Sequence, residues 1–105
     1  MTPMLGTRTH GGASCCLRIP AFAPRSMRNS VRELFRLQTR EQDRSQGHAS
    51  ALLVNVCAEA DEKNVTLVLR PDSESLIPWY EKHGFDLIQE EPVLLMSRDP
   101  SAERG

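Results

Sequence analysis

Arg44-Ser45-Gln46-Gly47-His48-Ala49 begins the segment that decides the fold, because the residues after Gly47 follow the period of an α-helix. Apolar side chains recur every three or four residues until the polar run Asp61-Glu62-Lys63-Asn64. This spacing predicts a helix with one buried face that ends at the polar run. The apolar positions are Ala49, Leu52, Leu53, Val56, Cys57 and Ala60.

Toward the C-terminus, the sequence predicts a strand, a short helix and a hairpin. Residues 65–69 are apolar and rich in β-branched side chains, which is typical of a central strand. Residues 73–83 follow a turn and precede a glycine, so they predict a second helix. Pro78 lies inside this helix and fits only if the first turn starts late. Residues 85–89 and 93–97 predict two strands joined by a polar turn.

Toward the N-terminus, residues 31–39 allow two interpretations. Ser30 and Glu33 have the Ser-x-x-Glu form of a capping box, which favours a helix. Arginines recur every four residues from Arg28 to Arg44, as they would on one helical face. Alternation of apolar and polar residues favours a strand instead, although Leu34 interrupts it. Taken alone, the residues favour the helix slightly and leave both interpretations open.

The remaining segments bound the domain. Residues 1–13 show no period and predict a flexible or irregular N-terminal arm. Residues 14–19 could form a short strand that Pro20 stops. Residues 14–98 would then make one domain, and residues 99–105 a disordered polar tail. A chain of 105 residues buries a modest core, so a homodimer would add useful burial.

Composition narrows the classes of partner. The formal net charge of −1 gives no bulk electrostatic reason to bind nucleic acid or an anionic membrane. No apolar run is long enough to span a bilayer, and no secretory leader is evident, so we expect a cytoplasmic protein without membrane contact. The three histidines lack metal-ligand spacing, so we expect no metal site. The odd cysteine count argues against a disulfide framework, with Cys57 a buried thiol and Cys15-Cys16 half-buried strand.

The turn from Arg44 to Ala49 has the features of an anion-binding site. The first N–H groups of a helix lack partners within the helix and carry a partial positive charge. Gly47 and Ala49 are small, so a phosphate could approach these amides, and Arg44 adds a full charge. The sequence contains neither the P-loop nor the dinucleotide-binding glycine pattern.

A second motif, Trp79-Tyr80-Glu81-Lys82-His83-Gly84-Phe85, ends the second predicted helix. It carries Tyr80, the only tyrosine of the chain. One interpretation is an amphipathic residue with its ring in the core and its hydroxyl in water. The other is a catalytic phenol that donates a proton or a hydrogen bond. Phe85 is predicted to be core in either case.

In this order, the two motifs resemble the acyl-CoA-binding half of the GNAT N-acetyltransferase family, over residues 31–98. The resemblance implies a strand at residues 31–39 and therefore an α/β (α+β) fold with a mixed sheet. The implied order is strand, helix, strand, helix, strand, strand, with the first two strands parallel and the last two antiparallel. It also implies that the N-terminal part of the domain is truncated, as in short GNAT-like chains of phage type.

The resemblance further implies a site for acetyl-CoA. The first motif would hold the diphosphate of coenzyme A, and the main chain before it would pair with the pantetheine arm. Tyr80 would act as general acid toward the thioester sulfur, and Glu33 is the candidate general base. Ser73 stands where the family often has a cofactor-binding asparagine. The expected cofactor-binding residues are Leu37, Gln38, Thr39, Arg44, Ser45, Gln46, Gly47, His48, Ala49 and Ser73.

The implied function is transfer of an acetyl group from acetyl-CoA to an amine, which could belong to a small molecule or a protein. One alternative is a non-catalytic GNAT-like module that binds coenzyme A or a protein partner. The truncated front, the serine at position 73 and the lack of an evident base favour that alternative. A lesser one is a nucleic-acid-binding face built from the arginines between Arg18 and Arg44.

Overall fold

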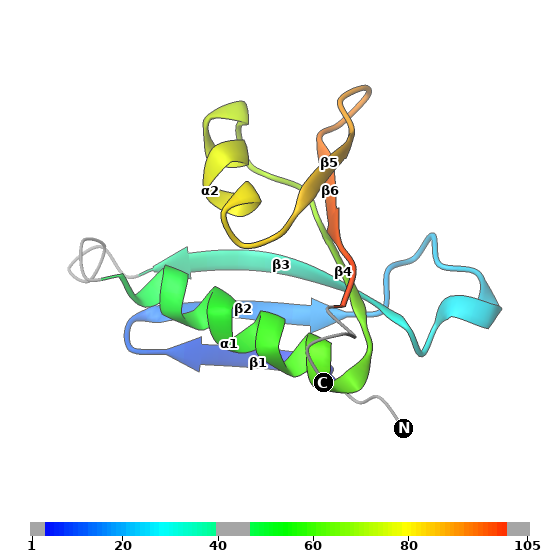
Figure 1. Cartoon of the computed structure of the whole chain (residues 1–105), viewed down its shortest axis with the longest axis horizontal. Helices are drawn as coiled ribbons and strands as arrows, with labels where there is room; N and C mark the ends of the chain where they lie inside the picture. Colours follow the sequence, from blue (N-terminus) through cyan, green and yellow to red (C-terminus); the bar gives the residue numbers. More distant parts are fainter. Residues whose placement is uncertain (1–3, 40–46, 101–105) are drawn as a thin grey trace.

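The computed structural model describes residues 4–39 and 47–100, which form a mixed six-stranded sheet with the order β1-β2-β3-β4-β6-β5. In Figure 1, β1, β2 and β3 run side by side behind α1, and α2, β5 and β6 lie above β3. The predicted mixed α+β class is therefore confirmed. The elements are β1 (Gly6–His10), β2 (Ala13–Arg18), the short 3-10 helix η1 (Arg25–Met27), β3 (Val31–Thr39), α1 (His48–Lys63), β4 (Thr66–Leu69), the 3-10 helix η3 (Glu74–Leu76), α2 (Ile77–Glu81), β5 (Asp86–Gln89) and β6 (Leu95–Arg98).

The N-terminal segment is more regular than its sequence predicts. The prediction is a flexible or irregular arm over residues 1–13, but Gly6–His10 forms β1 and pairs antiparallel with β2. Gly11 makes the turn between the two strands with a positive φ of 58°. Met4 is fully buried in the core. Pairing with β2 therefore orders a segment whose local pattern is weak. The strand predicted before Pro20 is confirmed as β2.

The strand interpretation of residues 31–39 is confirmed, and the helical interpretation is wrong. The apparent capping box has other partners, since Ser30 Oγ donates to the Met27 carbonyl at 3.2 Å. The Glu33 carboxylate accepts a hydrogen bond from Arg18 Nε at 2.9 Å. β3 pairs antiparallel with β2 and parallel with β4. These long-range pairings outweigh the local helical propensity.

β3 carries a bulge in its second half. Its pairing with β2 shifts by one residue between Phe35 and Gln38, and Arg36 has a left-handed φ of 57°. The extra residue brings Leu37 toward the same core as Leu34, three positions earlier. The bulge, with half-buried Phe35 on the other face, explains why apolar residues do not alternate strictly in this strand.

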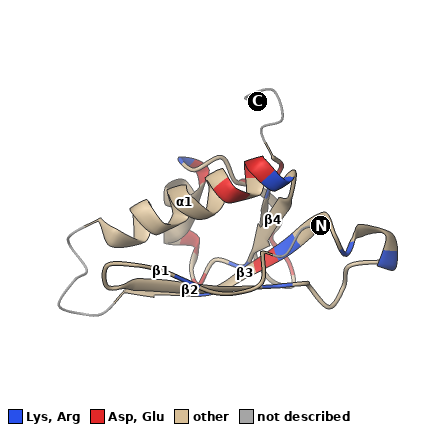
Figure 2. Ribbon diagram, turned by 90° about the horizontal axis from the view of Figure 1, so that it is seen from below, with Lys and Arg blue, Asp and Glu red and all other residues tan. Residues whose placement is uncertain are grey.

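α1 forms as its periodicity predicts and covers one face of the sheet. Gly47 precedes it with a left-handed φ of 76°, and Asn64 ends it with a φ of 59°. Figure 2 shows α1 on one side of β1, β2 and β3, with charged residues gathered toward its C-terminal end. The buried side chains of α1 match the predicted apolar face and are Leu52, Leu53, Val56, Cys57 and Ala60.

The C-terminal half follows the predicted order with one shorter helix. β3 and β4 are parallel and β5 and β6 antiparallel, as expected. The helix predicted over residues 73–83 is divided into η3 and the five-residue α2. Pro78 lies in the first turn of α2, where its missing N–H costs no helical hydrogen bond. Gly84 then turns the chain toward β5 with a φ of 93°.

Two ion pairs tie the C-terminal half of α1 to β6 and to β1, which lie on opposite sides of the centre of the sheet. Arg98 on β6 donates two hydrogen bonds to the Asp61 carboxylate, at 2.9 and 3.1 Å. Arg98 Nε also donates to the His83 carbonyl, which holds the end of α2. Arg8 on β1 donates twice to Glu59, both at 3.1 Å. These contacts fix the position of α1 over the sheet.

The three cysteines are free, and Cys15 and Cys57 are buried as expected for core thiols. Burial raises the pKa of each of these two thiols to about 11, which keeps them protonated at neutral pH. Among the described helices, none combines the length and apolar character that crossing a bilayer requires.

Candidate functional site

β3 has an open backbone edge in its second half. β4 pairs with β3 only at Val31–Glu33 and ends at Leu69. Within residues 4–39 and 47–100, no strand pairs with that edge of β3 from Leu34 to Thr39, although β2 continues along the other edge. Free N–H and C=O groups on a strand edge can pair with an extended ligand. The main chain expected to bind the cofactor, at Leu37, Gln38 and Thr39, lies on this open edge.

The amino-terminal end of α1 faces the same space. Gly47 caps the helix, and its carbonyl accepts the first helical hydrogen bond from the Ala51 N–H at 3.0 Å. A side chain at Gly47 would meet no atom of the described residues within 4 Å. No acidic residue occupies the first turn of α1. The predicted anion-binding turn therefore coincides with a helix start, while Arg44, Ser45 and Gln46 lie outside the described residues.

The open edge and the helix start border one cavity of about 690 Å³, within the range of small-molecule sites. The cavity brings together residues that are far apart in the sequence, from β3, α1, the β4–η3 connection and α2. Five of the ten predicted cofactor-binding residues line it. The lining residues are Leu37, Gln38, Thr39, Gly47, Ala49, Ser50, Asp72, Leu76, Trp79 and Tyr80.

Tyr80 lies at the inner wall of this cavity. α2 places it there, and its ring packs edge-on against Phe85 with centroids 5.8 Å apart. Only 6% of the residue is exposed. Burial, with smaller effects of Asp72 and Cys15, raises the pKa of the Tyr80 phenol to about 12. The Tyr80 phenol is therefore protonated at physiological pH and can donate a hydrogen bond. Its ring lies in the core, as the first interpretation expects, and its side chain also lines the cavity.

Trp79 holds α2 against the start of α1. Its indole Nε1 donates to Ser50 Oγ at 3.2 Å. Its ring also makes edge contacts with Tyr80 and His83, at centroid distances of 5.0 and 5.1 Å. Burial, with the nearby charges of Arg98 and Lys82, lowers the pKa of His83. This packing fixes the distance between Tyr80 and the amino-terminal end of α1.

A smaller cavity of about 200 Å³ continues from the larger one. Tyr80 and Asp72 line both cavities, together with Leu37 and Gln38 at the bulge. The smaller cavity adds Arg70 and Arg36 to its wall. Tyr80 and Asp72 thus lie where the two cavities adjoin, and the charged side chains that the smaller cavity adds are both arginines.

Three predicted site residues lie elsewhere. Ser73 is exposed, its hydroxyl lies 2.8 Å from that of Ser75, and it is not part of the lining of the large cavity. His48 packs near His10, with ring centroids 5.8 Å apart. Glu33 lies on the face of the sheet opposite α1 and pairs with Arg18. The structure therefore does not bring Glu33 into the cavity with Tyr80.

Four lining residues were not predicted from the sequence. Ser50 and Leu76 carry no local motif, and Trp79 was given no role within the second motif. Asp72 had a usable signal, because it follows a predicted central strand, and ligands of parallel strands gather at their carboxyl ends. Within the residues that the structure describes, no group of three or more histidine, cysteine or acidic side chains could hold a metal ion.

This protein matches known proteins in its fold but not in its sequence. No family profile matches this sequence, and no curated protein matches it either. Solved structures do match. The ribosomal-protein-S18-alanine N-acetyltransferase of Escherichia coli aligns with a TM-score of 0.67 and 21% identity, over 86% of this chain and 62% of that one.

Two further solved structures give the same result. A GNAT-family acetyltransferase of Staphylococcus aureus Mu50 has a TM-score of 0.64 and 16% identity, over 84% of this chain and 59% of that one. The PaiA N-acetyltransferase of Thermoplasma acidophilum, solved with coenzyme A, has a TM-score of 0.60 and 18% identity, over 83% and 52%. This chain therefore spans between half and two thirds of the length of these structures. The resemblance inferred from the two motifs is confirmed at the level of the fold, while the phage-type detail stays a prediction: the chain has the fold of GNAT-family N-acetyltransferases, over most of its own length.

Proposed function

We propose that this protein binds an acyl-CoA, with acetyl-CoA as the simplest donor, and transfers the acyl group to a primary amine. The observation that carries the proposal is the cavity of about 690 Å³ where the open edge of β3, the start of α1 and Tyr80 meet. The solved coenzyme A complex of the Thermoplasma protein, which shares the fold, supports the choice of ligand.

The described residues fit an acyl-CoA. The backbone of Leu37, Gln38 and Thr39 offers donors and acceptors to the amides of the pantetheine arm. The start of α1 at Gly47 offers N–H groups and a partial positive charge to the diphosphate. When bound, the acyl-CoA supplies a thioester carbon on which the amine forms a C–N bond as the C–S bond breaks and the thiolate leaves.

Tyr80 would stabilise the leaving sulfur by donating a hydrogen bond. The sequence suggested full proton transfer from a general acid. With the phenol pKa at about 12, however, a proton would move uphill to a thiolate whose acid has a pKa of about 8.5. A neutral donor held in a largely dry site stabilises developing negative charge without losing its proton. We therefore assign Tyr80 the role of hydrogen-bond donor.

The proton that the amine loses needs an acceptor. Asp72 lines both cavities beside Tyr80, so its carboxylate is placed to attract an ammonium group and to accept its proton, directly or through water. Glu33 remains a candidate base, but its carboxylate is held by Arg18 and lies 3.7 Å from Arg70. Asp72 lines the cavity of Tyr80 and Glu33 does not, so Asp72 is the better-placed acceptor.

A second candidate is a non-catalytic module that binds coenzyme A. The position of Glu33 outside the cavity that contains Tyr80 supports it. Both candidates need the same cofactor cavity. Formation of an acetylated amine separates them, because only the first candidate produces one.

Calorimetric titration with acetyl-CoA tests the cofactor site, and the chain offers a matched pair of glycines. Gly47 and Gly6 both have a positive φ, 76° and 92°, and at neither would a side chain meet a described atom within 4 Å. Gly47→Leu and Gly6→Leu should therefore carry similar backbone strain of about 1–2 kcal/mol. Only Gly47→Leu places a side chain in the cavity, so only that variant should lose binding. Absence of binding by the unaltered protein at millimolar acetyl-CoA would reject both candidates.

A further inference from the structure

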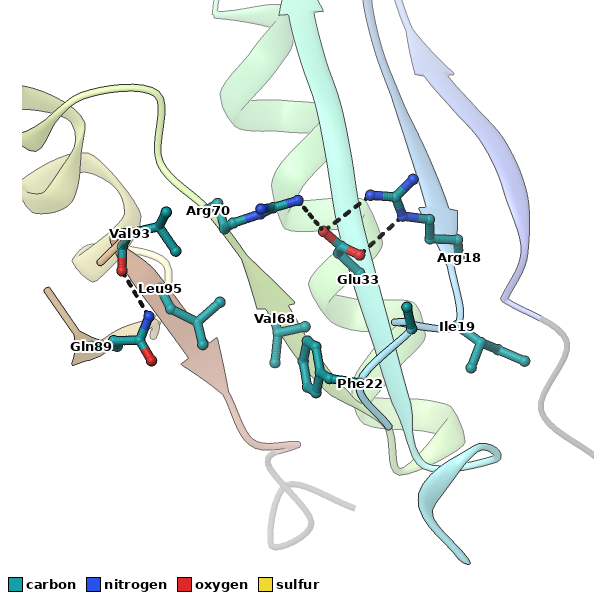
Figure 3. Close-up of a pocket in the computed structure, with 10 residues that line it drawn as sticks. Arg18, Ile19, Phe22, Glu33, Val68, Arg70, Gln89, Val93 and Leu95 are labelled. Carbon is teal, nitrogen blue, oxygen red and sulfur yellow. Dashed lines mark hydrogen bonds and ion pairs between the residues drawn. The ribbon is translucent and has the colours of Figure 1, made fainter. Parts of the chain in front are cut away.

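Arg70 lies beside the proposed reaction site and has no role in the function proposed above. It follows β4 directly and lines the cavity of about 200 Å³ that also contains Tyr80. It lines as well a cavity of about 710 Å³ on the face of the sheet opposite α1. Figure 3 shows its side chain reaching from β4 toward Glu33 on β3. Arg70 therefore lies between the space around Tyr80 and the cavity of about 710 Å³.

The two arginines near Glu33 differ in how closely they contact its carboxylate. Arg18 makes two hydrogen bonds to the carboxylate, at 2.9 and 3.3 Å, and its guanidinium lies 4.0 Å from the centre of the Phe35 ring. Arg70 approaches the same carboxylate only to 3.7 Å, beyond hydrogen-bond distance, and its side chain is 57% exposed. One carboxylate thus faces two guanidinium groups. The excess positive charge lies on Arg70, whose donors remain available to a ligand.

The small cavity also carries a negative charge. Asp72 lines that cavity together with Tyr80, and its negative charge contributes to the raised pKa of the phenol. Arg70, two residues earlier, extends instead toward Glu33. The cavity is therefore lined by positive charge from Arg70 and Arg36 and by negative charge from Asp72, and Asp72 is the one of the three that acts on Tyr80.

We propose that the acyl acceptor is a zwitterionic amine, an amino acid or a short peptide, whose ammonium group lies toward Asp72 and whose carboxylate binds Arg70. The inference rests on the proposed function, since it names the acceptor for that reaction. A guanidinium is suited to a carboxylate because it can donate two parallel hydrogen bonds. This orientation places the reacting nitrogen on the side of Asp72, whose charge acts on Tyr80.

The cavity of about 710 Å³ indicates that the acceptor carries an apolar side chain. Beyond Arg70, its wall includes Phe22, Val68 and Leu95. Phe22 is 63% exposed, so part of this apolar surface has no cover among the described residues. An acceptor anchored at Arg70 could place an aliphatic side chain against this wall, where burial of apolar area adds affinity.

The test compares acceptors that differ only in the carboxylate. L-leucine is paired with L-leucinamide, and the dipeptide Gly-Leu with Gly-Leu-amide, using acetyl-CoA as donor and thiol release as the signal. The two pairs separate an amino acid from a peptide as the preferred source. Amidation also changes the basicity of the amine in leucine, so the quantity of interest is how the kcat/KM ratio within each pair changes between protein variants.

Three variants make the test specific. Arg70→Gln should lower the ratio of acid to amide by roughly 5- to 10-fold, as expected for a partly exposed charged hydrogen bond. Arg70→Lys should restore part of the ratio, because it keeps the charge without the fork of donors. Arg25→Gln is the matched control. Arg25 is exposed in η1 and lines neither cavity, so this substitution removes the same charge at a distance from the proposed site. It should keep the unaltered ratio.

The failures of the two proposals can be told apart. Acetylation with a ratio that Arg70→Gln leaves unchanged would overturn the acceptor proposal and leave the transferase intact. If no acceptor is acetylated, Gly-Leu and Gly-Leu-amide are titrated calorimetrically into protein saturated with coenzyme A. Tighter binding of the acid that Arg70→Gln abolishes would support the proposal, and equal or absent binding would overturn it. Absence of acetyl-CoA binding would instead overturn the proposed function itself.

Discussion

The two halves of β3 differ in almost every property, although they belong to one continuous strand. Residues 31–33 pair with β2 or β4 or both, and their side chains are buried. Residues 34–39 keep β2 on one edge only, and their side chains alternate between half-buried and exposed after Leu34. The bulge at Arg36 lies in the second half, next to Tyr80 and the start of α1. Pairing builds the fold in the first half, and loss of pairing creates the candidate site in the second.

The difference shows how one sheet can supply both a core and a ligand-binding edge. Where β3 and β4 pair, the backbone groups satisfy one another. Where β4 ends at Leu69, the edge of β3 keeps donors and acceptors that an extended ligand could use. Side chains matter less on such an edge than the main chain does. The paired half should therefore respond to mutations in stability, and the open half in ligand binding.

The largest expected effect is on the paired half. Leu67 is fully buried in β4 opposite Arg32, so Leu67→Ala should lower the free energy of unfolding by about 2–5 kcal/mol. Leu37 is half-buried on the open half and lines the large cavity. Leu37→Ala should cost only about 1 kcal/mol but should weaken acetyl-CoA binding. Urea unfolding and calorimetric titration measure the two quantities. Equal loss of stability in both variants would contradict the division of β3.

Tyr80→Phe is the sharpest test of the open half. The substitution keeps the ring contact with Phe85 and removes only the hydroxyl. If Tyr80 donates to the leaving sulfur, kcat should fall roughly 100-fold with little change in acetyl-CoA affinity. Steady-state kinetics and calorimetric titration give the two values. An unchanged kcat would reduce Tyr80 to a packing residue.

The state of the phenol can be checked in the same protein. Tyr80 is the only tyrosine, so tyrosinate absorbance reports it alone. In the folded protein it should appear near pH 12, whereas in denaturant it should appear near the ordinary pKa of about 10. Since the folded pKa is the higher one, the contribution of this group to stability is complete below pH 10 and is lost as the pH rises through 12. A folded-state midpoint near 10 would remove the argument that Tyr80 keeps its proton.

The long helix α1 could be predicted from the sequence more securely than strands β1 and β3. α1 could be predicted because periodicity, the glycine before it and the polar run after it are all local signals. β3 was predicted as a strand only through the family resemblance, because its local signals slightly favour a helix and its partners β2 and β4 make it a strand. β1 was missed for the same reason, since its order depends on pairing with β2.

The candidate site divides in the same way. Tyr80, Gly47 and the edge at residues 37–39 could be predicted because motif order implied them, and the structure places all of them on one cavity. The sharing of Glu33 between two arginines could not, because it depends on which strands become neighbours. Long-range charge pairs leave no periodic or spacing signal in a single sequence.

The position of α1 over the paired half should depend on the contact between Asp61 and Arg98. Both side chains are largely buried, with 17% and 10% exposed. Asp61→Asn leaves the guanidinium without its full counter-charge, so the free energy of unfolding should fall by about 1–3 kcal/mol. The variant lies far from the open edge, and acetyl-CoA affinity should remain unchanged. Thermal unfolding with and without ligand measures both, and a loss of affinity would show that the two halves are coupled through α1.

The smallest expected effect concerns the contact of α1 with Arg8 on β1, and it disappears in acid. Hydrogen bonds from Arg8 lower the pKa of Glu59 against the opposing effect of burial, and Lys63 adds to them at 2.8 Å. A carboxyl group with a lowered folded pKa stabilises the protein above its unfolded pKa of about 4.3. That contribution is lost as the pH falls through the lower folded value. Glu59→Gln should therefore cost about 0.5–1 kcal/mol at neutral pH, and the difference from the unaltered protein should vanish once the pH is below the lowered pKa of folded Glu59. Urea unfolding at several pH values measures this difference, and a gap that persists in acid would assign the effect of Glu59 to packing rather than to charge.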